Sequence, residues 1–144
     1  IRGIVNGSAR MHAIVNTMLD MVRIDNQAME LVAVKIHPKF LLQEMLEQLR
    51  DAAEDRNITL ASEFTENLPA FEVDPYEMRK VFYHLLINAI KYTPDGGLVT
   101  LACAPINELG TEKIKIVVKD TGIGIDPEFQ ELVFTKFFQT GEVN

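Results

Sequence analysis

The apolar positions of the chain change their spacing along its length, and each spacing predicts a type of element. Over residues 1–25 they recur every three to four positions, which is typical of a helix that packs one stripe against other helices. Short runs rich in valine and isoleucine indicate strands. The pattern predicts, in order, a bundle helix over 1–25, a strand over 31–37, a helix from Pro38 to about Asp55, a strand over 57–64, an extended connection over 66–74, a helix between Pro75 and Pro94, strands over 99–104 and 113–119 joined by a loop, and a short helix and loop from Pro127 to about Phe138.

This order of elements predicts an α/β two-layer sandwich, with a mixed sheet and helices on one of its faces. In the strand over 113–119, apolar residues alternate with lysines, so one face should be buried and the other wet. A polar break over residues 25–30 divides the chain into an N-terminal bundle helix, 1–27, and a second domain, 28–144. A lone helix of this length is marginal in water, so we expect the first one to have a helical partner.

The helix before Pro94 has the strongest start and stop signals of the chain. Asp74 can cap its first turn, and Pro75 suits the first helical position, where a backbone N–H is not needed. Pro94 and the Asp-Gly-Gly run that follows it should end the helix. Five apolar residues at helical spacing are expected to face the core: Met78, Val81, Phe82, Leu85 and Ala89.

Polar residues of the same helix share one arc of roughly 80° on its surface. They are Glu77, Lys80, His84, Asn88 and Lys91, with Tyr92 at the edge of the arc. An amide oxygen can ligate a hard cation, an ammonium can contact a phosphate, and an aromatic ring can stack on a base. From this helix alone, the ordinary interpretation is a solvated stripe on an amphipathic helix, and a ligand site is the alternative.

The strand over 113–119 runs into a second polar motif, Asp-Thr-Gly-Ile-Gly-Ile-Asp. Gly122 and Gly124 allow positive φ and let a ligand approach the backbone closely, while Asp120 offers a fixed acceptor that could read an adenine amine. The motif could also be a tight turn whose glycines serve only the backbone. A third interpretation is catalytic, because Asp-Thr-Gly also occurs in aspartic proteases, where two aspartates share a proton.

The composition of the chain argues against some classes of binding partner. It is 47% hydrophobic and 24% charged, as in globular domains, and its net charge of −7 argues against nonspecific nucleic-acid binding and against an anionic membrane surface. The single cysteine, Cys103, cannot build a disulfide framework, so we expect a reducing, cytoplasmic compartment and a buried thiol. No apolar run approaches the ~20 residues of a membrane span, so any membrane attachment should come from segments upstream of Ile1.

Four segments of this sequence resemble one known family. LLINAIKYTPDGG (85–97) looks like the N box of the sensor histidine kinases of two-component systems, and VVKDTGIGID (117–126) resembles their first glycine box. VFTKFFQTGEVN (133–144) is similar to their phenylalanine box, and MHAIVNTMLDMVRID (11–25) to the second helix of their dimerisation and phosphotransfer hairpin. The resemblance implies a Bergerat-type ATP-binding fold, shared with type II topoisomerases and mismatch-repair ATPases.

The resemblance assigns a role to each matching residue. Asn88 matches the asparagine that ligates Mg²⁺ between the phosphates of ATP, Lys91 a phosphate-contacting lysine, and Tyr92 an aromatic residue beside the adenine. Asp120 matches the aspartate that reads the adenine amine. The remaining matches form the pocket wall and the anchors of a mobile lid: Gly122, Gly124 and Ile125 for the wall, Phe134 and Phe137 for the lid.

The sequence also departs from the family pattern. At His84, family members that hydrolyse ATP carry a glutamate and kinases usually an asparagine, so this candidate catalytic residue either completes the magnesium shell or simply fills the position. His12 and His37 lack the acidic residue and the spaced proline that follow a phosphoacceptor, so the acceptor is expected upstream of Ile1. The second glycine box does not occur before Asn144.

The resemblance implies the catalytic core of a histidine kinase. It would pass the γ-phosphoryl group of ATP to an upstream histidine and then to the receiver domain of a response regulator. The first helix would belong to a homodimeric bundle. Two alternatives stay open. One is a nucleotide-binding module that transfers no phosphate. The other is a homodimeric aspartic protease around Asp120, which the long predicted helices disfavour because that fold is mostly β.

Overall fold

The computed structural model divides the chain into two compact units, Ile1–Val32 and Ala33–Asn144. It describes residues 2–135, and at positions 2–10 and 13 the backbone alone. Among the described residues, no helix combines the length and the apolar character that crossing a membrane would require.

The first unit is the predicted helix, α1, which runs from Arg2 to Asp25. It ends in a Schellman motif, because Gln27 takes a left-handed conformation with φ of 51° and the N–H of Ala28 donates to Arg23 O at 2.9 Å. One set of apolar side chains along this helix is exposed: Met11, Ile14, Val15, Met18, Leu19 and Val22. These side chains make α1 a helix with an uncovered apolar stripe.

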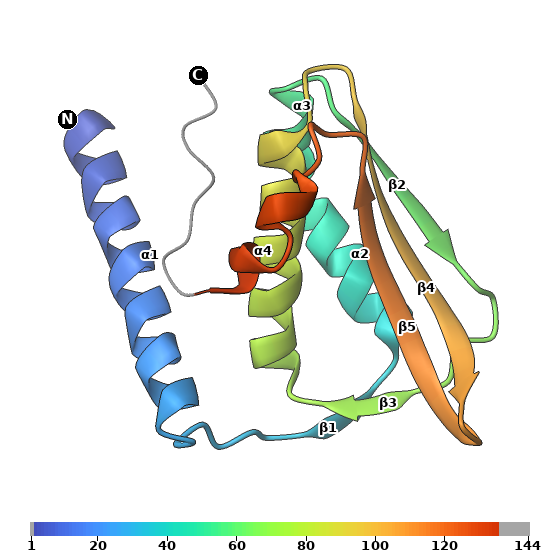
Figure 1. Cartoon of the computed structure of the whole chain (residues 1–144). Coiled ribbons are helices and arrows are strands. Elements are labelled where there is room, and N and C mark those ends of the chain that lie inside the picture. The colour runs from blue at the N-terminus through green and yellow to red at the C-terminus, as the bar shows by residue number, and fades with distance from the viewer. Residues whose placement is uncertain (1, 136–144) are drawn as a thin grey trace. The chain divides into compact units, whose positions relative to one another are not determined.

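The second unit is a two-layer α/β sandwich, as the sequence predicted. Its strands are β1 (Val34–Ile36), β2 (Thr59–Phe64), β3 (Phe71–Val73), β4 (Leu98–Glu108) and β5 (Thr111–Asp120), and its helices are α2 (Pro38–Gln48), α3 (Arg50–Glu54) and α4 (Pro75–Tyr92). The main sheet has the order β2-β4-β5, with β2 parallel and β5 antiparallel to β4. Figure 1 shows α2 and α4 covering one face of this sheet, while β1 and β3 form a separate antiparallel pair.

The core lies between the helix layer and the sheet. It joins Leu41, Leu42 and Met45 of α2 to Phe82, Leu86, Ala89 and Ile90 of α4 and to Val99, Leu101 and Cys103 of β4. Cys103 is a small buried hydrophobe, as predicted, and burial raises the pKa of its thiol, which therefore stays protonated at neutral pH.

The predicted apolar face of α4 is wrong at two positions. Val81 and Leu85 are 47% and 48% exposed, whereas Leu86 is fully buried. The buried residues recur at positions i, i+4, i+7 and i+8 from Phe82, a stripe that is rotated by about one residue from the prediction. Hydrophobicity is almost continuous over positions 85–87, so the sequence pattern does not fix which residue points inward.

The predicted single helix over 38–55 is two helices. The chain turns at Leu49, whose φ of −101° and ψ of 4° are not helical, and α3 follows. Leu49 and Ala53 are both buried, at 4% and 1% exposed. The burial of these two side chains, and not a continuous helical period, thus sets the direction of the chain after Leu49.

The strands also differ in length from the prediction. β1 covers only three of the residues predicted as strand over 31–37, and part of the predicted extended connection forms β3. The predicted loop over 105–112 is instead the end of a hairpin, in which β4 and β5 pair up to a two-residue turn. Leu109 and Gly110 of this turn have φ of 52° and 83°, the left-handed conformation of the tightest hairpins.

Candidate functional site

Helix α4 begins and ends at the predicted residues. Asp74 Oδ1 accepts hydrogen bonds from the backbone N–H groups of Tyr76, at 2.9 Å, and Glu77, at 3.2 Å. At the other end, the residue before Pro94 leaves the helical conformation, and the Thr93 hydroxyl donates to Ala89 O at 2.6 Å. The helix thus presents its last turn at a fixed point above the sheet.

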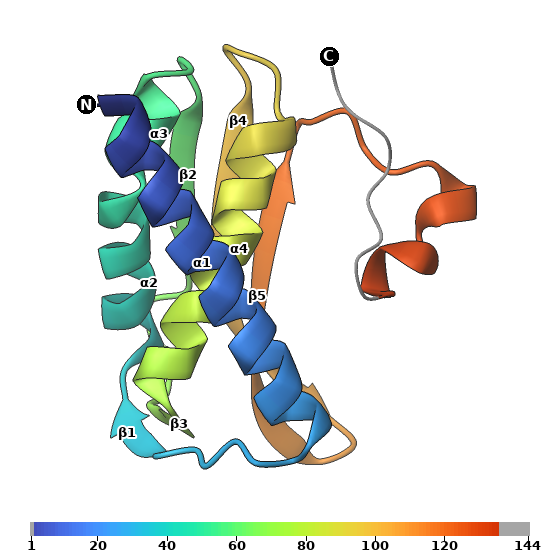
Figure 2. The same ribbon diagram turned by 90° about the vertical axis from the view of Figure 1, so that its left-hand side faces the viewer.

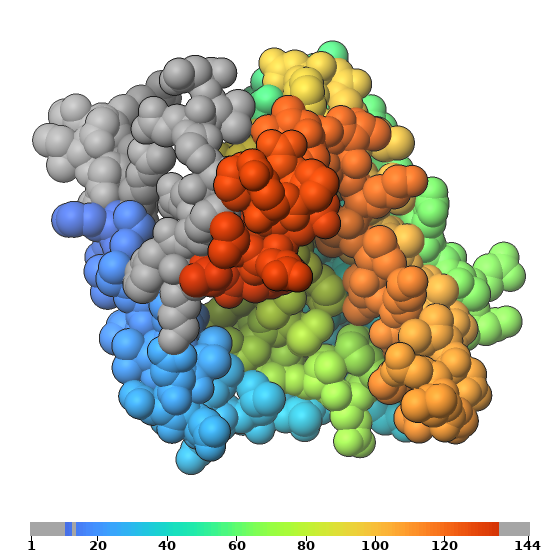
Figure 3. All heavy atoms as spheres, in the orientation of Figure 1, coloured from blue at the N-terminus to red at the C-terminus, as the bar shows by residue number. Residues whose placement is uncertain are grey.

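A cavity of about 530 Å³ opens at this last turn. Its described lining comes from α4, from the end of β5 and from the segment after β5: Leu85, Asn88, Ala89, Lys91, Tyr92, Val118, Asp120, Ile123, Gly124, Ile125 and Val133. In the view of Figure 3 the segment after β5, drawn in red, stands in front of α4, and Figure 2 shows it projecting away from the sheet. The cavity is therefore bounded on one side by irregular structure.

The structure brings most of the predicted site residues together and leaves others outside. Asn88, Lys91, Tyr92 and Asp120 line the cavity, and so do Gly124 and Ile125. The others do not line it: His84, Gly122 and Phe134. Phe134 belongs to η2 (Leu132–Phe134), a 3-10 turn that follows a similar turn, η1 (Pro127–Phe129), and its side chain is 89% exposed. Phe137 lies outside the described residues.

Only some of the residues in the polar arc of α4 line the cavity. Lys80 and Glu77 form an ion pair with each other, with Nζ and Oε2 3.1 Å apart. The ring of His84 packs edge-on against that of Tyr83, with 5.8 Å between the centroids. Asn88, in contrast, is exposed and lines the cavity. The first half of the arc is thus explained by ordinary surface contacts, and the ligand interpretation applies to the last turn.

Lys91 and Tyr92 present a cation and a ring at the same wall. Lys91 Nζ donates to the Tyr92 hydroxyl at 3.2 Å and lies 4.9 Å from the centroid of its ring. Lys91 is exposed, so this contact leaves its ammonium free to turn toward an anion. The wall can therefore contact a phosphate and an aromatic base within one turn of helix.

Asp120 has two distinct carboxylate oxygens. Its Oδ1 accepts a hydrogen bond from the backbone N–H of Gly122 at 2.8 Å, which fixes the plane of the carboxylate. Among the described contacts, none uses Oδ2. Asp120 can therefore accept a hydrogen bond from a ligand while it holds its own loop.

Glycine is required at two positions of this loop, Gly122 and Gly124, for different physical reasons. Gly124 has φ of +72°, the left-handed conformation that its position in the sequence predicted. Gly122 does not use this conformational freedom, because its φ is not positive. It is needed for space instead, because an added Cβ would lie 2.6 Å from both Asp120 Oδ1 and Tyr92 O. The neighbouring N–H of Ile123 donates to Tyr92 O at 3.2 Å, which ties the loop to the end of α4.

Sequence reasoning missed most of the apolar part of the lining, although it predicted Ile125. Leu85 was expected in the core and Val118 on the buried face of its strand, while Ile123 and Val133 were assigned no role in a site. The alternation along β5 places Val118 on the same face as Ile116, but it does not distinguish a core residue from one that lines a cavity. Among the described residues, no cluster of three or more histidine, cysteine or acidic side chains could hold a metal ion by itself.

Comparison with known proteins decides the family. Residues 73–144, half of the chain, match the model of the family described as "Histidine kinase-, DNA gyrase B-, and HSP90-like ATPase". The chain belongs to this ATPase family. The matched part of its second unit is a domain of the histidine kinase ATPase type, as the resemblance implied. The aspartic protease alternative is wrong, because the chain belongs to this ATPase family and folds as a two-layer α/β sandwich with long helices, whereas such a protease is mostly β.

Curated relatives of the chain include proteins that are named as kinases. The adaptive-response sensory kinase SasA of Rippkaea orientalis is 35% identical over 111 residues, which are 75% of this chain and 28% of SasA. Histidine kinase P4 of Formosa agariphila is 28% identical over 136 residues, which are 94% of this chain and 10% of P4. The chain thus spans less than a third of the length of these two curated relatives.

Solved histidine kinases share the fold. Full-length ShkA in complex with AMPPNP is similar with a TM-score of 0.82 and 26% identity, covering 90% of this chain and 27% of ShkA. The histidine kinase ThkA in complex with the response regulator TrrA has a TM-score of 0.73 and 24% identity, covering 94% of this chain and 38% of that one.

Proposed function

We propose that the cavity at the end of α4 binds ATP together with Mg²⁺, as the nucleotide site of a sensor histidine kinase. The observation that carries the proposal is the meeting of an amide, an ammonium, an aromatic ring and a carboxylate around one cavity, from two segments that are far apart in the sequence. A volume of about 530 Å³ falls within the range of small-molecule sites.

The base of the nucleotide would bind at the β5 side of the cavity. The free oxygen of Asp120 accepts a hydrogen bond from the adenine amine, while Ile123 and Ile125 supply apolar contacts to the ring. Tyr92 stands beside it at the end of α4. A carboxylate in this position repels the carbonyl oxygen that guanine carries at the same place, so the site should prefer adenine.

The phosphates would bind at the α4 side. Lys91 contacts a phosphate, and the amide oxygen of Asn88 is a suitable ligand for Mg²⁺, which usually takes one or two protein ligands and completes its shell with phosphates and water. The donor set fits this use, because the described residues offer no cage that would bind the ion without nucleotide. When bound, the ion neutralises phosphate charge. His84 has no step in this scheme, because it packs against Tyr83 outside the lining.

In the whole protein, we propose that the γ-phosphoryl group passes to a histidine of the phosphotransfer hairpin and then to a response regulator. The complex of ThkA with TrrA supports such a partner. Catalysis in this class of reaction rests on positioning and charge neutralisation, so Asn88 and Lys91 are the candidate catalytic residues. Phe134, exposed on η2, is the candidate lid anchor, together with Phe137. The unpaired Cys103 supports a cytoplasmic location.

The direct test is calorimetry of Mg²⁺ and a non-hydrolysable ATP analogue with the 144-residue chain and its Asn88→Ala variant. We expect the chain to bind, and the variant to lose about tenfold in affinity with Mg²⁺ but little with EDTA, because Asn88 acts through the ion. Asn107→Ala is the matched control, since this amide caps the distant hairpin turn through a 2.9 Å bond to the Gly110 N–H. No binding by the unaltered chain would refute the proposal.

We further propose that α1 dimerises through its exposed apolar stripe, and a charge within the stripe should weaken the dimer. Met18, 49% exposed, lies in the stripe, and Met18→Glu should raise the dimer dissociation constant about tenfold or more, because it removes buried apolar area and buries a charge. Sedimentation over a range of concentrations measures this. Asn16→Glu adds the same charge to the opposite side of the helix and should change little. A chain that stays monomeric at all concentrations contradicts the proposal.

A further inference from the structure

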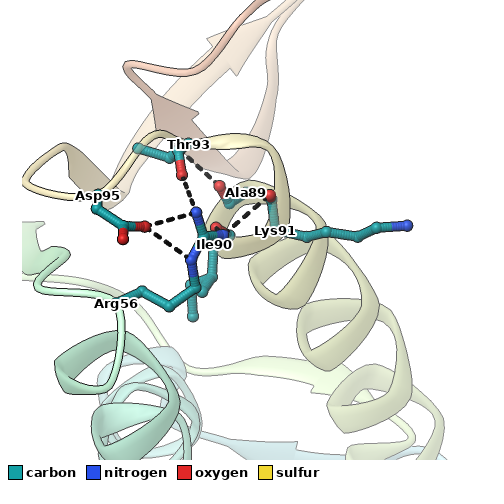
Figure 4. Close-up of polar contacts among 6 residues, drawn as sticks. All are labelled: Arg56, Ala89, Ile90, Lys91, Thr93 and Asp95. Carbon is teal, nitrogen blue, oxygen red and sulfur yellow. Dashed lines mark hydrogen bonds and ion pairs between the residues drawn. The ribbon is translucent and has the colours of Figure 1, made fainter. Parts of the chain in front are cut away.

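The guanidinium of Arg56 binds backbone carbonyl groups at the C-terminal end of α4. Arg56 lies in the turn between α3 and β2, and Figure 4 shows it between the last turn of α4 and the loop that follows. Nη1 donates to Ile90 O at 2.8 Å and to Lys91 O at 3.0 Å, and Nη2 donates to Thr93 O at 3.0 Å. Nε and Nη2 also donate to Asp95 Oδ1, at 3.0 and 2.8 Å.

These contacts meet a requirement of every helix. The last four carbonyls of a helix have no partner within it, and they carry the negative end of the helix dipole. A guanidinium has five donors in one plane and a fixed charge, so a single residue can bind several of these carbonyls at once. The pair with Asp95 adds little energy by itself, since the two side chains are 37% and 71% exposed. The carbonyl bonds therefore carry the main effect.

We call the hydrogen bonds from the Arg56 guanidinium to the end of α4 a clamp. Backbone hydrogen bonds on both sides of Arg56 strengthen it. The N–H of Gly96 donates to Asn57 O at 3.1 Å, and the N–H of Thr59 donates to Gly97 O at 2.9 Å. The turn that carries Arg56 is thus held against the loop after α4 at two points besides the guanidinium. Arg56 itself does not line the cavity.

The clamped residues are those that shape the cavity wall. Arg56 binds the carbonyls on either side of Tyr92, and Tyr92 O accepts the N–H of Ile123 in the glycine loop. Gly122 packs against the same Tyr92 carbonyl, so the position of this peptide group fixes the loop that carries Asp120. A shift of the helix end would therefore move both walls of the cavity.

We propose that Arg56 is a positioning residue of the nucleotide site, which sets the last turn of α4 and, through Tyr92, the loop after Asp120. The inference rests on the proposed function. It assigns a role in nucleotide affinity to a residue that touches neither the ligand nor the cavity, and that precedes the N box by almost thirty residues of sequence.

The test compares Arg56→Met with Arg79→Met in the 144-residue chain. Arg79 is the matched control: it is also 37% exposed, its Nε and Nη2 bind Glu44 at 3.1 and 2.9 Å, and its Nη1 binds Pro75 O at the opposite end of α4. Arg56→Met should raise the Kd for the Mg²⁺–ATP analogue roughly three- to thirtyfold, as mutations outside a ligand site do when they shift its walls. Arg79→Met should leave it unchanged within about twofold.

Amide hydrogen exchange separates positioning from general loss of stability. The Ile123 amide should exchange faster in Arg56→Met than in Arg79→Met, because its acceptor belongs to the clamped segment. Arg56→Lys should give an intermediate Kd, since an ammonium has three donors and cannot reach all four acceptors. Equal affinities for the unaltered chain and Arg56→Met overturn the inference alone. If Arg56→Met does not fold, an unchanged Kd in Arg56→Lys overturns it. An unaltered chain that binds no nucleotide overturns the proposed function and this inference with it.

Discussion

Replacing Asp120 by alanine should weaken nucleotide binding about ten- to a hundredfold, the effect of losing one hydrogen bond to a charged group. Two consequences act in the same direction. The variant loses the acceptor for the adenine amine, and it frees the loop, because Asp120 Oδ1 also holds the N–H of Gly122 at 2.8 Å. Calorimetry with the Mg²⁺–ATP analogue measures the loss.

Asp120→Asn distinguishes the two consequences. Its amide oxygen can keep the bond to Gly122, but its NH₂ group then faces the adenine amine, and two donors cannot pair. We therefore expect this variant to keep the loop in place and still lose affinity. It should also lose the preference for adenine over guanine nucleotides, which the carboxylate imposes by repelling the guanine carbonyl.

Asp126→Ala is the control for charge. It removes one negative charge from the same exposed segment, but Asp126 does not line the cavity and makes no side-chain cap bond to η1. The affinity of this variant should stay within about twofold of that of the unaltered chain, since the charge of an exposed carboxylate outside the cavity is screened by salt. If Asp120→Ala binds as tightly as Asp126→Ala, Asp120 has no part in recognising the base.

Leu86→Ala should have the largest effect on stability, a loss of about 2–5 kcal/mol in the free energy of unfolding. Leu86 is 0% exposed and lies in the core stripe of α4, between the helix layer and the sheet. Truncation removes buried apolar area and leaves a cavity that the rigid surroundings fill only in part. Urea denaturation followed by circular dichroism measures the change.

The neighbouring residue provides a matched control. Leu85→Ala makes the same chemical change one position earlier, where the side chain is 48% exposed, so its cost should be below about 1.5 kcal/mol. Because Leu85 lines the cavity, that variant should affect nucleotide affinity more than stability. A larger loss of stability in Leu85→Ala than in Leu86→Ala would mean that the buried stripe of α4 is the one that the sequence pattern predicted and not the observed one.

Local signals in the sequence determined the ends of α4 and indicated several of the residues that line the cavity. The capping bonds of Asp74, the proline at position 75 and the proline at position 94 act within one turn of helix, so their effect can be read without knowledge of the fold. The alternation along β5 is equally local, and the two boxes identified the family from their residues alone. The helix of the first unit follows from the apolar period of residues 1–25 in the same way.

Tertiary structure decided the features that depend on contacts between distant segments. Whether Leu85 or Leu86 points inward depends on how α4 lies on the sheet, because both are equally apolar. Leu109 has positive φ in the hairpin turn, a conformation that a leucine disfavours. The pairing of the ten residues of β5 with β4 imposes this conformation. Gly122 is needed for the approach of Tyr92 O, and Arg56 finds its acceptors more than thirty positions later. No pattern within either segment records the other, so only the folded chain places these groups together.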